Sequence, residues 1–485
     1  MKWTGALIPS FYGVPSRVEV LLHKPRLHAG ISWLQPLLLL LAVAIAVKAD
    51  QYSDFTYSTD GTNVTITGYT GTNSNVVIPD TISDLPVTGI GNGAFTNYCF
   101  QLSSVTIPDS VTSIGNFAFY YCIGMNSVTM GNNVSNIGSG AFEACWSLTN
   151  FTIPDSVTSI GDSVFAYSGL TSVTIGNGVT SIGASAFSAC SLTSVTIGNG
   201  VISIGASAFS YCGNLRSVSI PSSVTNIGNE AFLRCDSLTA ITVDADNSAF
   251  SSLDGVLFDR SQTTLILFPG GKTGSYTVPN GVTSIADYAF YWCRGLTNAT
   301  IGNSVTNIGA SAFFACGLTS VTIGNGVTSI GDRAFVGNTS LRSVTIGNSV
   351  NSIGYWAFGN CPSAGVYFQG NAPVVDPTAF SVDSNLTVYY LPGTTGWDQW
   401  VSPPPAVLWN PQAQTSDANF GVRTNRFGFT ITGTTNIPIV VEATTNLAGA
   451  PWTMLQSCTL TNGLVYFSDP QWTNYPSRFY RIRSP

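Results

Sequence analysis

Apolar and polar residues alternate in a short motif that recurs along most of the chain. In one copy, Leu192, Val195 and Ile197 are separated by Ser and Thr, which is the period-two pattern of a strand with one buried face. A second apolar run, residues 201–204, follows after Asn199-Gly200. Each copy therefore predicts two short strands joined by a tight turn.

The motif repeats with a fixed period. Residues 169–190 and 191–212 differ at three positions only, and the Ile that ends the second strand recurs every 22 to 24 residues apart from one gap of 58. These are Ile90, Ile114, Ile137, Ile160, Ile182, Ile204, Ile227, Ile285, Ile308, Ile330 and Ile353. An Ala-Phe or a variant of it follows each, at Phe95, Phe119, Phe142, Phe165, Phe187, Phe209, Phe232, Phe290, Phe313, Phe335 and Phe358, with a degenerate copy at Phe380. A period in this range predicts a solenoid of stacked units.

Two local features need interpretation within that solenoid. Asn-Gly between two apolar alternations normally indicates a β-hairpin. One unit cannot bury its own apolar face, whereas stacking gives every strand a parallel neighbour about 4.8 Å away, so we expect parallel strands instead. The segment after the second strand, such as residues 206–212, is expected to be a short helix or helical turn with its Phe in the core.

The repeated pattern L-x-S-V-T-I-[GP]-x-x-V-T-S-I-G-x-x-A-F-x-x-C resembles the BspA-like leucine-rich repeat family over roughly residues 76–365. The 58-residue gap contains residues 243–271, which are similar to the longer hairpin-bearing unit that such proteins often insert. Residues 54–71 resemble the N-terminal cap of these proteins, and residues 365–397 resemble their atypical final unit. The resemblance implies a surface protein that adheres to host matrix proteins or to other cells.

The fold class expected is thus a leucine-rich-repeat solenoid of parallel strands with short helical turns, followed by a small all-β module. We expect a signal peptide at 1–49, a β cap at 50–92 and repeats at 93–365, with the longer unit at 238–284. An atypical cap and Pro-rich linker would occupy 366–410. Residues 411–485 lose the period and show several short β-type runs, which favour a sandwich-like module.

The N-terminal segment changes the chemistry that the chain can perform. Basic residues precede the apolar run 37–47, and Val47-Lys48-Ala49 has the form that signal peptidase cleaves, so we expect export and no retained membrane segment. Cleavage after Ala49 would remove both histidines and leave 12 basic and 23 acidic residues, with Lys272 the single lysine. A chain without His has no Ser-His or Cys-His nucleophile pair and no His ligand for a metal. The acidic balance disfavours nucleic acid as a partner.

Cysteine spacing follows the repeat. Eight cysteines lie three residues after the repeat Phe: Cys122, Cys145, Cys190, Cys212, Cys235, Cys293, Cys316 and Cys361. In-register neighbours about 5 Å apart are too far for a relaxed disulfide, so we expect a column of free, buried thiols. Metal binding is not expected without His or paired C-x-x-C spacing.

Two other sets of side chains suggest alternative functions. Asp244, Asp246, Asp254 and Asp259 cluster in the longer unit, and such carboxylates could serve a hydrolase, although turn and loop roles explain them as well. Outward Ser and Thr, such as Ser172 and Thr174, would form hydroxyl columns that could match a crystalline lattice. Thr also simply suits an exposed strand.

Residues that vary between otherwise identical units give the site hypothesis. Most units carry Ser or Ala around the turn, but some carry aromatic residues or Arg, which protein interfaces and sugar platforms favour. The candidates are Tyr120, Tyr121, Trp146, Tyr211, Tyr291, Trp292, Arg294, Tyr355 and Trp356. Packing between turns would explain them equally well.

We therefore expect a non-catalytic, extracellular or cell-surface binding protein that presents a rigid repeat surface to a protein or glycan. It is expected to be monomeric and to need no cofactor. A structural role in an envelope or matrix, and a hydrolase that uses the Asp cluster, are the alternatives.

Overall fold

The computed structural model describes residues 52–361, 365–381, 386–400, 404–448 and 451–485. The predicted signal peptide at 1–49 lies outside these residues. Among the described helices, none has the length and apolar character needed to cross a membrane.

The first strands of successive units lie in one column, which backbone hydrogen bonds divide into four parallel sheets. Val173 and Ile175 of β12 (Ser172–Ile175) point into the core, and Thr174 between them points outward. β12 pairs in register with the units before and after it, so that Val173 lies opposite Val195 of β14 (Ser194–Thr196). The other strands of this column are β3 (Asn75–Val77), β6 (Ser104–Thr106), β8 (Ser127–Thr129), β10 (Asn150–Ile153), β16 (Ser217–Ile220), β18 (Ala240–Val243), β22 (Gly274–Thr277), β24 (Leu296–Ile301), β26 (Ser320–Ile323), β28 (Ser343–Ile346), β30 (Gly365–Phe368), β32 (Thr387–Tyr390) and β33 (Ala406–Leu408).

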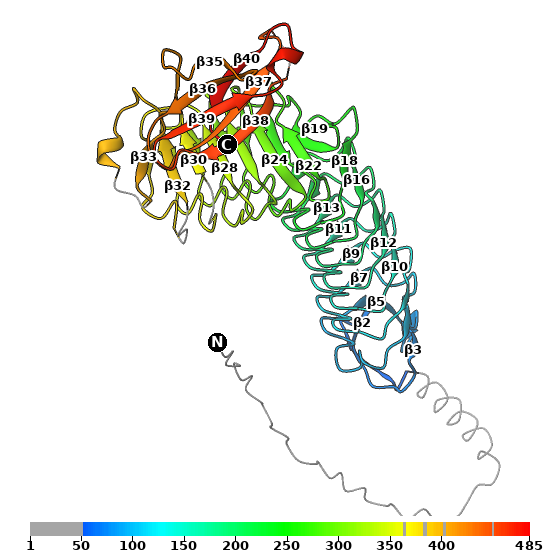
Figure 1. The fold of residues 1–485 in the computed structure, drawn as a ribbon. Helices are drawn as coiled ribbons and strands as arrows, with labels where there is room; N and C mark the ends of the chain where they lie inside the picture. Colours follow the sequence, from blue (N-terminus) through cyan, green and yellow to red (C-terminus); the bar gives the residue numbers. More distant parts are fainter. Residues whose placement is uncertain (1–51, 362–364, 382–385, 401–403, 449–450) are drawn as a thin grey trace, which may run out of the picture. The chain divides into compact units, whose positions relative to one another are not determined.

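The second strand of each unit forms a parallel column of its own, whose successive strands follow one another as rungs (Figure 1). Its first part contains β2 (Val64–Tyr69), β5 (Leu85–Ile90), β7 (Ser113–Ile114), β9 (Asn136–Ile137), β11 (Ser159–Ile160), β13 (Ser181–Ile182), β15 (Ser203–Ile204) and β17 (Asn226–Ile227). Its second part contains β21 (Thr264–Leu267), β23 (Ser284–Ile285), β25 (Asn307–Ile308), β27 (Ser329–Ile330), β29 (Ser352–Ile353) and β31 (Val374–Val375). At the N-terminal end, β1 (Phe55–Thr59) and β4 (Thr81–Ile82) add antiparallel to β2 and β5. The predicted parallel solenoid is confirmed.

Gly200 shows why Asn-Gly here does not make a hairpin. β14 and β15 belong to different columns and each pairs with the same strand of a neighbouring unit. A Cβ built on Gly200 would collide with the backbone carbonyl of Asn177 in the preceding unit. Glycine is therefore required by the close approach of two stacked turns, since any side chain would force the units apart.

The repeat Phe side chains form the core. The rings of Phe187 and Phe209 are fully buried, and they stack with centroids 5.2 Å apart at an interplanar angle of 6°. The stack continues from Phe95 to Phe232 and again from Phe268 to Phe380. Each ring therefore buries both faces against the units on either side, which ties the stability of a unit to its neighbours.

The segment that carries the Phe, expected to be a short helix or a helical turn, is a turn. The described residues contain two 3₁₀ helices, η1 (Trp397–Gln399) and η2 (Trp472–Asn474), and no α-helix. In the units from Phe119 to Phe232 and from Phe290 to Phe358, the residues two before and two after the repeat Phe adopt the left-handed conformation, as Ser207 (φ 55°) and Tyr211 (φ 60°) do around Phe209. A left-handed residue twice in eight prevents an α-helix from forming.

The longer unit interrupts both the second column and the Phe stack. β19 (Phe250–Leu253) and β20 (Val256–Asp259) form a hairpin through Asp254-Gly255, and β20 pairs antiparallel with β21. The buried Asn247 side chain anchors this insert, because its amide donates to the carbonyls of Pro221 (2.7 Å) and Val224 (2.9 Å). The sheet that ends at β17 does not continue into the sheet that contains β21.

The C-terminal residues form two small antiparallel sheets. One contains β34 (Gln412–Gln414), β35 (Gly421–Arg423), β36 (Arg426–Thr432) and β39 (Leu464–Asp469). The other contains β37 (Pro438–Thr444), β38 (Thr453–Thr459) and β40 (Phe479–Arg483). Their shared apolar cluster includes Tyr367 of β30 and Tyr389 of β32, so the module packs on the outward face of the first column.

Candidate binding surface

The left-handed residues of the turns line one edge of the solenoid, and we call this surface the turn edge. It consists of the residues two before and two after each stacked Phe. They include Phe117, Tyr121, Ser163, Tyr167, Ser185, Ala189, Ser207, Tyr211, Glu230, Arg234, Tyr288, Trp292, Ser311, Ala315, Arg333 and Trp356. Some units place glycine there, as at Gly93, Gly140 and Gly337.

A left-handed backbone is unfavourable for bulky side chains. It costs about 1 kcal/mol or more for a residue other than glycine, and glycine avoids this cost. The aromatic side chains of Tyr121, Tyr211 and Trp292 therefore do not stabilise the backbone conformation of the turn. Tyr211 is also 55% exposed, so burial in the core does not explain it. Their presence requires another reason.

Near the N-terminal end of the turn edge, five aromatic side chains form one connected cluster, which we call the aromatic cluster. Tyr121 contacts Tyr120 (ring centroids 5.8 Å apart), Trp146 (5.5 Å) and Phe100 (6.1 Å). Phe117 joins through Tyr120 at 5.7 Å. All five are exposed, and the mutual contacts restrict their rotamers. The result is a preformed apolar surface that loses little side-chain entropy on binding.

In the middle of the turn edge, arginine and aromatic side chains alternate. The Arg234 guanidinium lies 4.1 Å from the Trp292 ring centroid and 5.7 Å from that of Tyr211. The Arg294 guanidinium also lies over Trp292, 4.1 Å from its ring centroid. Trp292 thus contacts two cations, and both contacts restrict its indole ring at the surface.

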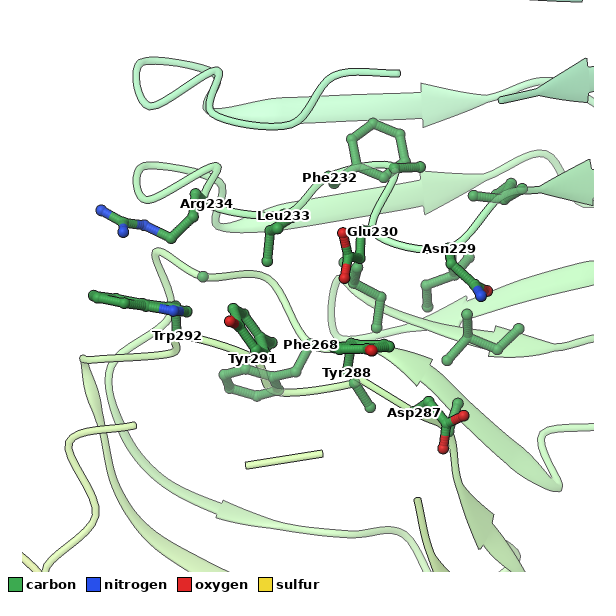
Figure 2. Close-up of a pocket in the computed structure, with 18 of the residues that line it drawn as sticks. Asn229, Glu230, Phe232, Leu233, Arg234, Phe268, Asp287, Tyr288, Tyr291 and Trp292 are labelled. Carbon is green, nitrogen blue, oxygen red and sulfur yellow. The ribbon is translucent and has the colours of Figure 1, made fainter. Parts of the chain in front are cut away.

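A cleft of about 270 Å³ opens beside this group, where the longer unit interrupts the solenoid. Figure 2 shows Arg234 and Trp292 at one end of it and Glu230 and Asp287 toward the other. Phe268 and Leu257 contribute apolar lining. Polar groups of both signs therefore flank an apolar floor.

A third group lies further along the turn edge. Tyr355 and Trp356 stack with centroids 5.9 Å apart, and the Arg333 guanidinium lies 5.3 Å from the Tyr355 ring centroid. The nine residues singled out in the sequence thus fall into three groups. Tyr120, Tyr121 and Trp146 belong to the aromatic cluster, Tyr211, Tyr291, Trp292 and Arg294 to the middle group, and Tyr355 and Trp356 to the third.

Sequence reasoning missed Phe100, Arg234 and Arg333. Arg234 occupies the same station as Tyr121 and Tyr211, two residues after the repeat Phe, and Arg333 occupies the station of Trp356, two residues before it. Comparing the residues at each station would have found both arginines. Phe100 lies off these stations and carries no such signal.

The cysteines form the expected column, and the structure shows what each thiol does. No disulfide joins any of the ten cysteines among the described residues. The Cys190 thiol donates to the carbonyl of Phe165 (3.0 Å), and the Cys212 thiol donates to that of Phe187 (3.1 Å), in each case in the preceding unit. Asn338 takes this station in one unit and donates to Phe313 at 2.8 Å. Each of these side chains therefore ties one unit to the Phe carbonyl of the preceding unit, and the carbonyl of Phe165 also accepts the amide of Ser168 in its own turn (3.0 Å).

Burial also makes these thiols poor nucleophiles. Desolvation raises the pKa of Cys190 to about 12 and that of Cys235 to about 12. Cys99, at the end of the column, differs, since a hydrogen bond from Cys122 lowers its pKa to about 7. Among the described residues no three His, Cys, Asp or Glu side chains are grouped as a metal site would require.

The Asp cluster of the longer unit has structural partners. The Asp259 carboxylate accepts hydrogen bonds from Ser261, Thr263 and the amide of Thr264. Burial opposes its ionisation, but these donors outweigh burial and hold the pKa of Asp259 below its ordinary value. Asp254 forms the hairpin turn, and Asp244 accepts the amide of Asp246.

The outward hydroxyls of the first column do not form one continuous array. β14 is not hydrogen-bonded to β16, so the column is divided there. Further along, the C-terminal module covers Ser343, whose hydroxyl donates to the carbonyl of Pro485. Ser172 and Ser320 donate to the side chains of Asn150 and Asn298 and are not free toward solvent.

The repeats match a known family. The sequence profile of the BspA type leucine rich repeat region, in six copies, matches residues 88–212, 158–274 and 266–387. No curated protein matches the chain.

Solved structures of several bacterial proteins are similar. A leucine-rich cell surface protein from Faecalibacterium prausnitzii is 33% identical with a TM-score of 0.61, over 72% of this chain and 95% of that one. A leucine-rich repeat protein from Bacteroides ovatus is 24% identical (TM-score 0.54, 74% and 98% covered). The pneumococcal vaccine antigen PcpA is 22% identical (TM-score 0.52, 70% and 92% covered). The last two support the fold alone.

Proposed function

The chain belongs to the BspA-type leucine-rich repeat family, and from that premise we propose that it is a non-catalytic binding protein of the bacterial cell surface. Its ligand would be a protein or a glycan, bound along the turn edge. Export through the N-terminal segment and adhesion as the biological outcome are parts of the same proposal.

The observation that carries the proposal is the mismatch between backbone and side chain at the turn edge. Ser, Ala or Gly occupy the left-handed stations in many units, and they suffice for the turn. Tyr121, Tyr211 and Trp292 occupy the same stations at a conformational cost and remain at least partly exposed. Tyr, Trp and Arg are also the residues that dominate the binding energy of interfaces.

Rigidity favours this surface as a binding site. Ladder hydrogen bonds fix each turn to its neighbours, and cation–π contacts fix Trp292 and Tyr355. A ligand that binds a preformed surface loses less entropy to ordering it. Three separate groups on one edge would let a long or repeated ligand make several weak contacts at once.

A binding screen tests the proposal. The purified chain would be applied to arrays of glycans, matrix proteins and intact cells, beside three double variants: Tyr121→Ala with Trp146→Ala, Tyr211→Ala with Trp292→Ala, and Tyr355→Ala with Trp356→Ser. We expect a specific hit that at least one variant loses by tenfold or more. A hit that all three retain would contradict binding by the turn edge. Absence of any hit, with ordered self-assembly of the chain, would favour a structural role instead.

A further inference from the structure

Backbone hydrogen bonds join successive turns into a ladder along the turn edge. In the units from Phe119 to Phe209 and from Phe290 to Phe335, the amide groups of the Phe and of the residues two before and two after it donate to carbonyls of the next unit. Ser207 donates to Asn229 (3.0 Å), Phe209 to Ala231 (2.8 Å) and Tyr211 to Leu233 (2.7 Å). The same bonds recur through the stack, so each turn is completed by the backbone of the next one.

The ladder stops at the longer unit. Within the described residues, the amides of Glu230, Phe232 and Arg234 have no hydrogen-bond acceptor, although the equivalent amides of the preceding unit all have one. The carbonyls of Thr225 and Ile227, at the free edge of β17, likewise receive no donor from any described residue. One wall of the cleft therefore presents three unpaired donors at two-residue spacing.

The opposite wall presents acceptors. In the turn of residues 286–293, the carbonyl of Ala289 accepts the amide of Phe268 at 2.8 Å. The carbonyls at the two flanking ladder positions, Asp287 and Tyr291, receive no donor from the described residues. Residues 266–270 thus replace only the middle of a full turn, and they leave the cleft between the two walls.

We propose that this cleft binds a short peptide segment of a partner protein, which completes the turn that residues 266–270 replace only in its middle. Its carbonyls would accept from Glu230, Phe232 and Arg234, and its amides would donate toward Asp287 and Tyr291. Addition of a segment to a free backbone edge is a known mode of peptide recognition, in which main-chain bonds supply affinity. The inference rests on the proposed binding function but concerns a different set of contacts.

An anion is the other ligand that three amide donors could hold. The cleft disfavours it, because Glu230 and Asp287 also line the site and the free carbonyls would repel negative charge. A polypeptide backbone carries both donors and acceptors and so satisfies both walls together. Backbone complementarity therefore favours a peptide.

Side chains of the cleft indicate which peptides would bind. If the segment runs parallel to the turns, as every neighbouring turn does, its N-terminal part lies near Glu230 and Asp287 and its C-terminal part near Arg234 and Trp292 (Figure 2). We expect a basic residue early in the segment and an apolar residue above Phe268. Charge complementarity at the acidic end would select the register.

The test uses a random heptapeptide library displayed on phage, panned against the full chain and followed by synthesis of the enriched peptides. Hydrogen exchange would then be measured with and without peptide. We expect dissociation constants in the micromolar range and at least tenfold slower exchange of the amides of Glu230, Phe232 and Arg234. If the peptide slowed hydrogen exchange only in other segments, or if panning enriched no peptide, the inference would be overturned.

Variants separate the cleft from the rest of the surface. Leu233→Trp fills the cleft that Leu233 lines, and we expect at least tenfold weaker peptide binding, whereas Leu447→Trp, on the C-terminal module, should leave binding unchanged. Glu230→Lys gives a second test if Leu233→Trp does not fold, since it should weaken the binding of basic peptides. Equal binding by the wild type and these cleft variants would overturn the proposal.

Two controls distinguish the possible failures. Sodium sulfate that slows the same three amides, while no peptide does so, would show an anion site and refute the peptide. The variant Tyr121→Ala with Trp146→Ala should bind the enriched peptides normally, because the aromatic cluster does not line the cleft. Loss of array binding in that variant with retained peptide binding would support both proposals separately.

Discussion

Removal of one stacked ring tests how the solenoid is held together. The Phe209 side chain is fully buried, and its faces stack on Phe187 (5.2 Å) and Phe232 (5.5 Å) at angles of 6° and 3°. Burial of the ring contributes about 2–3 kcal/mol. The two ring pairs together add about 1–3 kcal/mol. Phe209→Ala should therefore lower the free energy of unfolding by about 3–5 kcal/mol.

Two matched variants calibrate that loss. Phe209→Leu keeps most of the volume and should cost about 1.5 kcal/mol. Phe100→Ala removes the same side chain at a position that is 67% exposed, and it should change stability by no more than about 0.5 kcal/mol. The three variants share chemistry and differ in burial and stacking.

Urea unfolding followed by circular dichroism gives the unfolding free energy of each variant, and hydrogen exchange shows which segments are destabilised. Repeat arrays lose cooperativity locally, so faster exchange should be confined to the turns around Phe187, Phe209 and Phe232. A loss below about 1 kcal/mol for Phe209→Ala, or the same loss for Phe100→Ala, would refute the reasoning that the ring stack supplies the core energy.

Three further predictions follow from close contacts, burial and charge. Gly200→Ala should lower the unfolding free energy by more than about 2 kcal/mol, whereas Gly213→Ala, where a Cβ meets no atom within 4 Å, should be neutral or stabilising in the same urea assay. In the native chain at pH 8, a thiol reagent should modify the half-buried Cys458 and leave Cys190 intact, because burial raises the pKa of Cys190 to about 12; labelling of Cys190 without unfolding would contradict this. Burial opposes ionisation of Glu442, but hydrogen bonds from Arg483 and Arg481 outweigh burial and lower its pKa. The ionised carboxylate therefore stabilises the folded module fully above its unfolded pKa of 4.5, and this contribution is lost as the pH falls through its folded pKa. Because the side chains of Arg481 and Arg483 are 46% and 41% exposed, Glu442→Gln should cost the C-terminal module only about 1–2 kcal/mol at pH 7, and it should reduce the fall of its melting temperature below pH 4.5; an unchanged acid transition would exclude this carboxylate as the cause.

The alternation around residues such as Val195 and Ile197 was sufficient to predict the strands, because apolar residues at every second position form the buried face of a strand. The repeat of Phe209 and its equivalents likewise located the core. The conformation of the turn was not predictable from composition. Ala favours a helix locally, and the ladder between units overrides that preference at Ser207 and Tyr211.

The candidate site was partly predictable for a related reason. Tyr121, Tyr211 and Trp292 stand out because neighbouring units carry small residues at the same stations. Arg234 shares a station with Tyr121 and Tyr211 and was identifiable on that basis, but its contact with Trp292, on another unit across the longer insert, was not predictable. The unpaired amides of Glu230, Phe232 and Arg234 have no sequence signature, since every residue other than proline carries the same group.

Restoring the small residues at the left-handed stations tests the central claim most directly. The variant would combine Tyr121→Ala, Tyr211→Ala, Trp292→Ala and Trp356→Ser, which introduce the residues that other units carry at these stations. Its affinity for the ligand found on the arrays would be measured beside its unfolding free energy. We predict loss of binding by at least a hundredfold in a variant that folds with undiminished stability. Full affinity in that variant would show that the turn edge does not bind the ligand.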